Sequence, residues 1–299
     1  MTHATIIFLG PSLPLEQAKT ILPDAFYLPP IQCGDLLNCF QYQPQRIGII
    51  DGYFEHCATV WHKEILLALD RGITVYGAAS MGALRAAELT EFGMIGVGHI
   101  FKDFYHGVLE DDDEVAVVHR PDKSDYESFT DAMVNIRATL QKAVQEKIIN
   151  PTVAEKIIYY AKVEFYKERS LEKAIDRCES TETQLLKAWL SQGNFVDQKK
   201  LDAIELLETI KKDVSRVVVQ QWVDPIVLNT TILLRRLNDR HQCESLENSQ
   251  QAQLEKQYPG ITRYSKLLAY LLKTRDRLRP LHKGKLDDNI FTDSPSVIW

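Results

Sequence analysis

The chain has 299 residues, 45% hydrophobic and 25% charged, which is the composition of an ordinary soluble globular protein with room for two domains. Its net charge of −6 is unevenly divided: residues 1–122 hold 7 Lys and Arg against 16 Asp and Glu, which argues against a nucleic-acid surface, and the remainder holds 28 against 25. The chain starts without the features of a signal peptide and contains no apolar segment long enough to span a bilayer, so we expect a cytoplasmic protein with no membrane partner.

Three short apolar runs in the first part of the chain each end in small or polar residues. They read ATIIFLGPS at residues 4–12, RIGIIDGYF at 46–54 and ITVYGAAS at 73–80. Segments with helical spacing separate them. Continuous apolar strands that alternate with helices indicate a mainly parallel sheet with helices on both faces. The sequence therefore predicts a Rossmann-like α/β domain over residues 1–122.

Polar residues follow each of these predicted strands. In open parallel sheets, ligands bind beyond the carboxyl ends of the strands. This rule places Ser12, Asp51 and Ser80 in one crevice, although they lie far apart in the sequence.

The stretch VYGAASMGALRAAEL, residues 75–89, has the pattern of a strand, a tight turn and the start of a helix. Its AASMG is related to the nucleophile elbow G-x-S-x-G, with Ala78 in place of the first glycine and Gly82 as the second. In this interpretation Ser80 is an exposed nucleophile. In the alternative, Ser80 is only a helix N-cap whose oxygen accepts an N–H from Gly82 or Ala83. The two interpretations are compatible with each other.

The helix VWHKEILLALDRG lies between the second and third runs and carries three polar residues in its first turn. His62, Lys63 and Glu64 are therefore expected near the end of the strand that bears Asp51. The imidazole of His62 is the best-placed neutral base near the turn. The alternatives are that His62 is a structural residue and that Lys63 is merely solvated.

Residues 91–107 are rich in glycine and aromatic side chains, and we expect a short strand or loop and a helical turn that partly roofs the crevice. An acidic turn, Glu110 to Asp113, and a predicted strand, Glu114 to His119, follow. His119 thus joins the candidates for the crevice. The acids permit a Mg²⁺ or Mn²⁺ site, but no ligand spacing specifies one, and a solvated turn is the alternative.

The remaining residues, 123–299, have the spacing of amphipathic helices, and we predict a helical accessory domain. Asn150 and Pro151 form a cap and first-position pair for one helix. Residues 264–278 are expected to form the last helix. The basic run at residues 274–285 is either a solvated helix end or a contact for an acidic group.

No cofactor or metal motif is present in the sequence. The five cysteines have irregular spacing and form no C-x-x-C pair, so neither a zinc site nor a disulfide framework is indicated. There is no G-x-G-x-x-G and no P-loop. We therefore expect no bound cofactor and no metal.

Eight segments in order between Leu9 and His119 resemble the TfuA-like family. They read LGPS, PPIQCGDLL, GIIDGYFE, VWHKEIL, GAASMGALRAAEL, FGMIGVGHIF, YHG and DDDEVAVVH. The central string is highly specific, whereas the helical region carries no recognised motif. The resemblance implies a role beside a YcaO-type ATP-dependent enzyme in thioamide formation on ribosomally made peptides, with a precursor peptide as a further possible partner.

The contribution that the resemblance implies is sulfur delivery, through hydrolysis of the C-terminal thiocarboxylate of a ThiS-like carrier to release sulfide. Hydrolysis is an acyl transfer and needs a nucleophile, a proton acceptor and donors for the oxyanion. We assign Ser80 as nucleophile, His62 or Lys63 as base, and Asp51 as the residue that orients the base. Substrate contacts are predicted for Ser12, Met81, Gly82, Arg85, Glu88 and His119.

Within this predicted set, the amides of Met81 and Gly82 form the oxyanion hole and Arg85 docks the charged end of the carrier. Glu88 lies one turn from Arg85 and is expected to pair with it. Water is the alternative nucleophile, and Cys33, Cys39 and Cys57 are rival sulfur carriers. A non-catalytic adaptor that presents the sulfur donor is the main alternative function, and an anion- or nucleotide-binding protein is a weaker one.

Overall fold

The computed structural model describes residues 4–55, 57–119 and 126–214. The chain divides into two compact units, Met1–Cys243 and Glu244–Trp299, and every described residue belongs to the first. The predicted last helix and the basic run lie outside the described residues. None of the described helices is both long and apolar enough to cross a membrane.

A parallel five-stranded sheet forms the centre of the first part of the chain. Its strands run in the order β2-β1-β3-β4-β5, and every pairing is parallel. The strands are β1 (Thr5–Phe8), β2 (Phe26–Leu28), β3 (Arg46–Ile49), β4 (Thr74–Gly77) and β5 (Ile95–Gly96). The predicted α/β class is confirmed, and the strand order is the flavodoxin-like form of the doubly wound fold.

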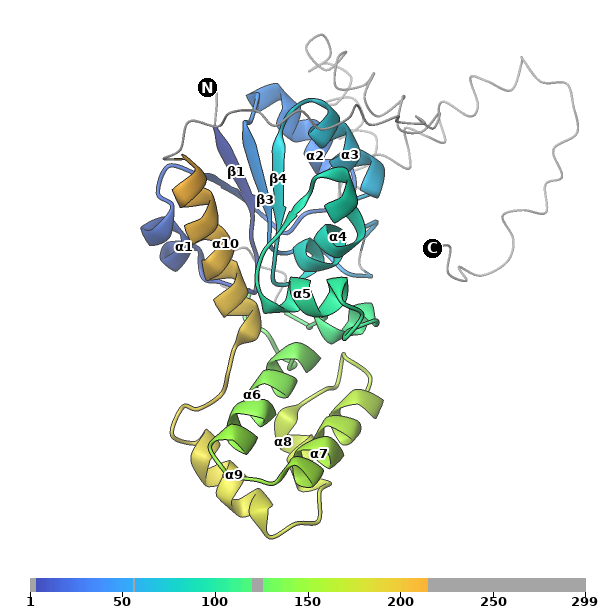
Figure 1. The fold of residues 1–299 in the computed structure, drawn as a ribbon, viewed down its shortest axis with the longest axis vertical. Helices are drawn as coiled ribbons and strands as arrows, with labels where there is room; N and C mark the ends of the chain where they lie inside the picture. The colour runs from blue at the N-terminus through green and yellow to red at the C-terminus, as the bar shows by residue number, and fades with distance from the viewer. Residues whose placement is uncertain (1–3, 56, 120–125, 215–299) are drawn as a thin grey trace, which may run out of the picture. The chain divides into compact units, whose positions relative to one another are not determined.

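Helices cover both faces of this sheet (Figure 1). One face packs on α2 (Asp35–Cys39), α3 (His62–Asp70) and α4 (Met81–Leu89) through a core that includes Phe8, Ile49, Ile65 and Met81. The other face packs on α1 (Leu15–Ile21) and α10 (Gln198–Val214). The remaining elements of this part are α5 (His99–Tyr105) and the 3₁₀ turns η1 (Phe40–Tyr42), η2 (Thr90–Phe92) and η3 (Asp112–Glu114).

Four helices between the sheet and α10 have a hydrophobic core of their own. They are α6 (Met133–Gln145), α7 (Pro151–Val163), α8 (Leu171–Asp176) and α9 (Glu182–Leu190). The start of α7 is the predicted one, because the side chain of Asn150 accepts a hydrogen bond of 3.0 Å from the N–H of Val153 and Pro151 occupies the first helical position. The predicted helical character of the later region is therefore confirmed for its described residues.

The long helix α10 returns from these helices to the sheet. Its apolar stripe of Ala203, Leu206, Leu207 and Ile210 is fully buried against residues of β1 and β4. Asp202, on the same helix, accepts a hydrogen bond of 2.8 Å from the N–H of Ile100 and so caps α5. The predicted domain boundary at Asp122 falls in residues 120–125, outside the described residues, and stays a prediction.

The predicted strand from Glu114 to His119 is wrong. Residues 112–114 form η3, residues 116–118 have no regular structure, and His119 makes a single antiparallel bridge with Ser128. Side chains take the place of a neighbouring strand: the Thr130 hydroxyl accepts the N–H of Val118, and the Lys199 ammonium group donates to the carbonyl of Val115. The apolar run of this segment thus reflects its burial and not membership of the sheet.

Candidate functional site

A cavity of about 260 Å³ opens beyond the carboxyl ends of β1, β3 and β4. The connections leave β1 and β3 in opposite directions along the sheet, so the cavity lies at the topological switch point where doubly wound proteins bind ligands. It is lined by Pro11, Asp51, Gly52, Tyr53, Phe54, Ser80, Val115, Ala116, Val117, Val118, His119, Tyr166 and Lys199. Of the predicted site residues, it therefore brings together Asp51, Ser80 and His119.

Asp51 is buried in the floor of this cavity and fastens the loop after β1. Its carboxylate accepts hydrogen bonds from the N–H of Gly10 at 2.9 Å, the N–H of Ser12 at 3.1 Å and the hydroxyl of Ser12 at 2.7 Å. These bonds allow an ionised carboxylate to stay buried. Ser12 is thereby joined to the site, as expected, but through Asp51.

Ser80 stands at the corner between β4 and α4, and its side chain makes no capping hydrogen bond. The prediction that the hydroxyl caps the helix is therefore wrong, and Ser80 lines the cavity instead. The turn is tight: Ala79 has a φ of +65°, and a Cβ at Gly82 would lie 1.8 Å from the carbonyl oxygen of Ile49. A glycine is required where α4 crosses the end of β3, and this strained turn places the buried Ser80 at the cavity.

The two predicted oxyanion donors differ in the structure. The N–H of Gly82 donates to the carbonyl of Ile50 at 3.4 Å. Met81 is the first residue of α4, where a helix leaves its N–H groups without intrahelical partners. Among the described residues, the N–H of Met81 has no acceptor, so Met81 is the better donor of the pair.

Lys199 is a cavity residue that the sequence interpretation missed. Its side chain is buried, and its ammonium group donates to the carbonyl oxygen of Val115 at 2.9 Å. Burial lowers the pKa of Lys199, while the charges of Asp51 and Asp197 act in the opposite direction without cancelling this effect. A lysine with a lowered pKa in a cavity is a candidate proton acceptor.

The position of Lys199 is fixed by contacts between α6 and the start of α10. Asn135 on α6 accepts the N–H of Lys199 at 3.1 Å and donates from its amide to Asp197 at 2.9 Å. Asp197 in turn caps α10 by accepting the N–H of Lys200 at 3.1 Å. The cavity thus depends on a residue that is held by the helical region.

The remaining predicted site residues form a separate surface cluster on α3 and α4. His62 and Arg85 both contact the Glu88 carboxylate, through Nε2 at 2.8 Å and Nη1 at 2.6 Å. Although burial alone would raise the pKa of Glu88, these two partners lower it. The predicted pairing of Arg85 with Glu88 is present, but neither His62 nor Lys63 is among the described residues that line the cavity, so the structure does not bring the predicted base to Ser80.

Aromatic side chains surround one end of the cavity. The ring of His119 lies 6.3 Å from that of Tyr53 and 5.5 Å from that of Tyr126, between ring centres. Tyr166 packs edge-on against Phe54, and its hydroxyl donates a hydrogen bond of 2.7 Å to the carboxylate of Glu55. His119 is therefore part of an aromatic wall, which agrees with a role in substrate contact.

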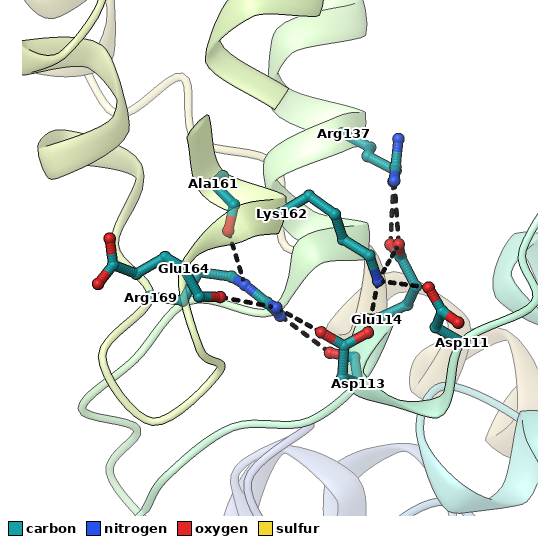
Figure 2. A network of polar contacts seen from close by, with 8 residues as sticks. All are labelled: Asp111, Asp113, Glu114, Arg137, Ala161, Lys162, Glu164 and Arg169. Carbon is teal, nitrogen blue, oxygen red and sulfur yellow. Dashed lines mark hydrogen bonds and ion pairs between the residues drawn. The ribbon is translucent and has the colours of Figure 1, made fainter. Parts of the chain in front are cut away.

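The acidic turn that permitted a metal site is an ion-pair network (Figure 2). The carboxylate oxygens of Asp111, Asp113 and Glu114 lie within 4.8 Å of one another, close enough to hold an ion. The Lys162 ammonium group contacts all three of these carboxylates. The second cation of the network, the fully buried Arg169, donates to the carboxylate and the carbonyl of Asp113. Protein cations thus occupy the position that a metal would need.

The same network has a third cation on the side of Glu114, as Figure 2 shows. Arg137 on α6 donates two hydrogen bonds of 2.9 Å to this buried carboxylate. Because Val115 directly follows Glu114, the network anchors the segment that forms the wall of the cavity. Its role in the described structure is therefore to position that wall.

The rival cysteine site has a poor nucleophile. Burial raises the pKa of Cys33, and the neighbouring Glu64 carboxylate, to which the thiol is hydrogen bonded, raises it further. Burial also raises the pKa of Glu64 to about 7, although Glu64 accepts hydrogen bonds from the N–H groups of Trp61 and Gly34. A thiol in these surroundings stays protonated at neutral pH and reacts slowly.

Fold and cavity together define the class: a doubly wound parallel α/β protein with a cavity at its switch point, completed by a lysine from a later helix. Residues 51–170 match the family model described as TfuA-like protein, which confirms the predicted resemblance over that segment. The match covers Asp51, Ser80 and His119 and ends before Lys199. No curated protein matches the chain.

Proposed function

We propose that this chain is a thiocarboxylate hydrolase that releases sulfide from a ThiS-like carrier protein for a YcaO-type ATP-dependent enzyme. The observation that carries the proposal is that Ser80, with no capping bond, shares a cavity with the buried Lys199, whose pKa is lowered. Serine with lysine as its base is a known variant of the hydrolytic triad. The YcaO partner, the carrier and a peptide substrate for thioamidation come from the TfuA-like resemblance.

The proposed reaction begins when neutral Lys199 accepts the proton of the Ser80 hydroxyl. The serine oxygen forms a bond to the carbonyl carbon of the thiocarboxylate, and the carbon–sulfur bond then breaks while protonated Lys199 gives its proton to the departing sulfur, which leaves as hydrosulfide. Water attacks the resulting ester, neutral Lys199 accepts the proton of this water, and it returns the proton to the Ser80 oxygen as the ester bond breaks. The products are a carrier with a C-terminal carboxylate and regenerated Ser80.

Two neighbouring groups support charge development in this scheme. In this scheme the N–H of Met81, which has no acceptor among the described residues, stabilises the oxyanion of the tetrahedral intermediate. The Asp51 carboxylate balances the positive charge that Lys199 gains, since these two groups interact electrostatically. Asp51 thus acts on a lysine, where the sequence interpretation had it orient His62 or Lys63.

The proposal is tested by sulfide release from a thiocarboxylated carrier. We expect Ser80→Ala and Lys199→Met each to lower the rate by at least about 10³-fold, the size found when one member of a catalytic unit is removed. Both variants should still bind the YcaO-type enzyme, because the two side chains lie inside the cavity. If Ser80→Ala releases sulfide at the wild-type rate, or thioamidation proceeds unchanged with it, the protein is a non-catalytic adaptor and the proposal is wrong.

A further inference from the structure

The wall segment, residues 115–119, presents its main chain to the cavity. Val115 ends η3 in a helical conformation, residues 116–118 have no regular structure, and His119 bridges Ser128. All five residues line the cavity, although side chains alternate between two sides along an extended stretch such as the one that leads into this bridge, so the backbone there also faces the cavity. The cavity is therefore bounded on this side by peptide groups as well as by side chains.

One edge of the wall segment is already occupied. The N–H of Val118 donates to the Thr130 hydroxyl at 2.9 Å, and the carbonyl of Val118 accepts the N–H of Phe129 at 2.7 Å. In an extended chain, consecutive residues direct their N–H and C=O groups to opposite edges. Val117 must then direct its groups away from residues 128–130.

The opposite edge is open at Val117. Among the described residues, neither the N–H nor the C=O of Val117 has a hydrogen-bonding partner. Val117 is partly exposed, so its groups are accessible from the cavity. An unpaired donor and acceptor on one extended residue form the minimal site for an added strand.

We propose that this edge binds the C-terminal tail of the substrate as an extended strand paired with the main chain of Val117. The inference rests on the proposed function, because the thiocarboxyl group at the end of the tail must reach Ser80. The cavity lining supports a peptide occupant: apart from Asp51, Lys199 and the imidazole of His119, the described lining residues carry no ionisable group other than tyrosine hydroxyls. Recognition through the main chain therefore suits an uncharged tail.

The orientation of the tail follows from burial along the wall segment. Val115 and Ala116 are buried and Val115 accepts from Lys199, whereas residues 117–119 are partly exposed. The reacting thiocarboxyl group is thus placed at the Val115 end, beside Lys199. The rest of the tail passes Val117 and leaves along the aromatic wall that includes His119 and Tyr53.

The test compares thioacids that have and lack a peptide backbone. The probes are thioacetate, a tripeptide thioacid, and versions of this peptide that are N-methylated at each backbone amide in turn. A single hydrogen bond contributes about tenfold in affinity, so we expect one N-methylated peptide to lose about tenfold in kcat/KM relative to its parent. Because this series leaves the protein unchanged, it does not depend on how a variant folds.

The matching protein variants are Val117→Pro, which lacks the N–H, and Val117→Ala, which keeps it. We expect Val117→Pro to lower kcat/KM for the tripeptide thioacid about tenfold more than kcat/KM for thioacetate, whereas Val117→Ala, which keeps the N–H, should change both values by the same factor. Equal rates for all N-methylated peptides would overturn the strand-pairing inference while leaving the hydrolase intact. Failure of wild-type protein to hydrolyse any of these thioacids would overturn the proposed function itself.

Discussion

The cavity and the acidic turn both combine carboxylates with cations, but they arrange these charges differently. In the turn, three carboxylates meet Lys162, Arg137 and Arg169, and each cation contacts at least one carboxylate directly. In the cavity, the single carboxylate of Asp51 is satisfied by the loop after β1, and Lys199 donates to a carbonyl oxygen.

This difference separates a structural cluster from a chemical site. Cations that pair directly with carboxylates keep their charge, as Lys162 shows. Burial alone would lower the pKa of Lys162, but the three carboxylates outweigh this effect, and the pKa is raised. A lysine whose only direct partner among the described groups is a neutral carbonyl responds mainly to burial, which lowers its pKa. In the proposed mechanism the conspicuous acidic run of the sequence is thus the inert region, and the inconspicuous lysine is the reactive group.

The strongest test of the structural assignment is Arg169→Met. The arginine is fully buried, and its loss removes the donor to the carbonyl and to one carboxylate oxygen of Asp113, while Lys162 still contacts this carboxylate, so we expect the free energy of unfolding to fall by about 3 kcal/mol. Urea denaturation followed by circular dichroism measures this. The matched control Arg137→Met removes a more exposed cation and should cost less. An Arg169→Met protein as stable as the wild type would show that the turn is not a structural anchor.

The opposite result is expected for the stability of Lys199→Met. Burial of an ammonium group opposes folding, so at neutral pH this variant should unfold with a free energy equal to that of the wild type or up to roughly 2 kcal/mol higher. The folded-state pKa of Lys199 lies below the ordinary value of 10.5, so wild-type stability should rise with pH between these two values, and this rise should be absent in the variant. Urea denaturation at several pH values checks both points. If Lys199→Met is less stable than the wild type, Lys199 has a structural role like that of Arg169 in the acidic turn.

The smallest effect is expected for His62→Ala. His62 is half exposed and contacts Glu88 on the surface, so its loss should change thioacetate hydrolysis by no more than about twofold. Arg85→Ala, in the same surface cluster, serves as the matched control for this activity assay. A loss as large as that of Ser80→Ala would mean that the imidazole reaches the cavity during the reaction.

Local pattern was sufficient to predict much of the fold. The apolar runs before Ser12, Asp51 and Ser80 are β1, β3 and β4, and the rule for parallel sheets brought these polar residues together. The strand β2 was missed because its apolar run, Phe26 to Leu28, is only three residues long and only partly buried. The segment after Glu114 was predicted as a strand because it is rich in valine, and these valines line a cavity instead.

The sequence predicted mainly those residues of the candidate site that directly follow a strand. Lys199 is 148 positions from Asp51, and a single lysine in a polar run has no local signature. A signal was nevertheless present: Lys199 precedes Ala203, Leu206, Leu207 and Ile210 at spacings of 4, 7, 8 and 11, which places it on the buried stripe of α10. A charged residue on an apolar stripe identifies a buried cation, but only tertiary structure shows what it faces.

The return of α10 to the sheet has a consequence for biosynthesis. A nascent chain that has emerged only through residue 170 contains the serine and the carboxylate of the cavity but lacks the helix that supplies the lysine and covers one face of the sheet. Synthesis from the N-terminus therefore delays assembly of the reactive centre until the intervening four helices have been made and α10 has docked. Under the proposed function, a partly made protein would be unable to discharge a carrier prematurely.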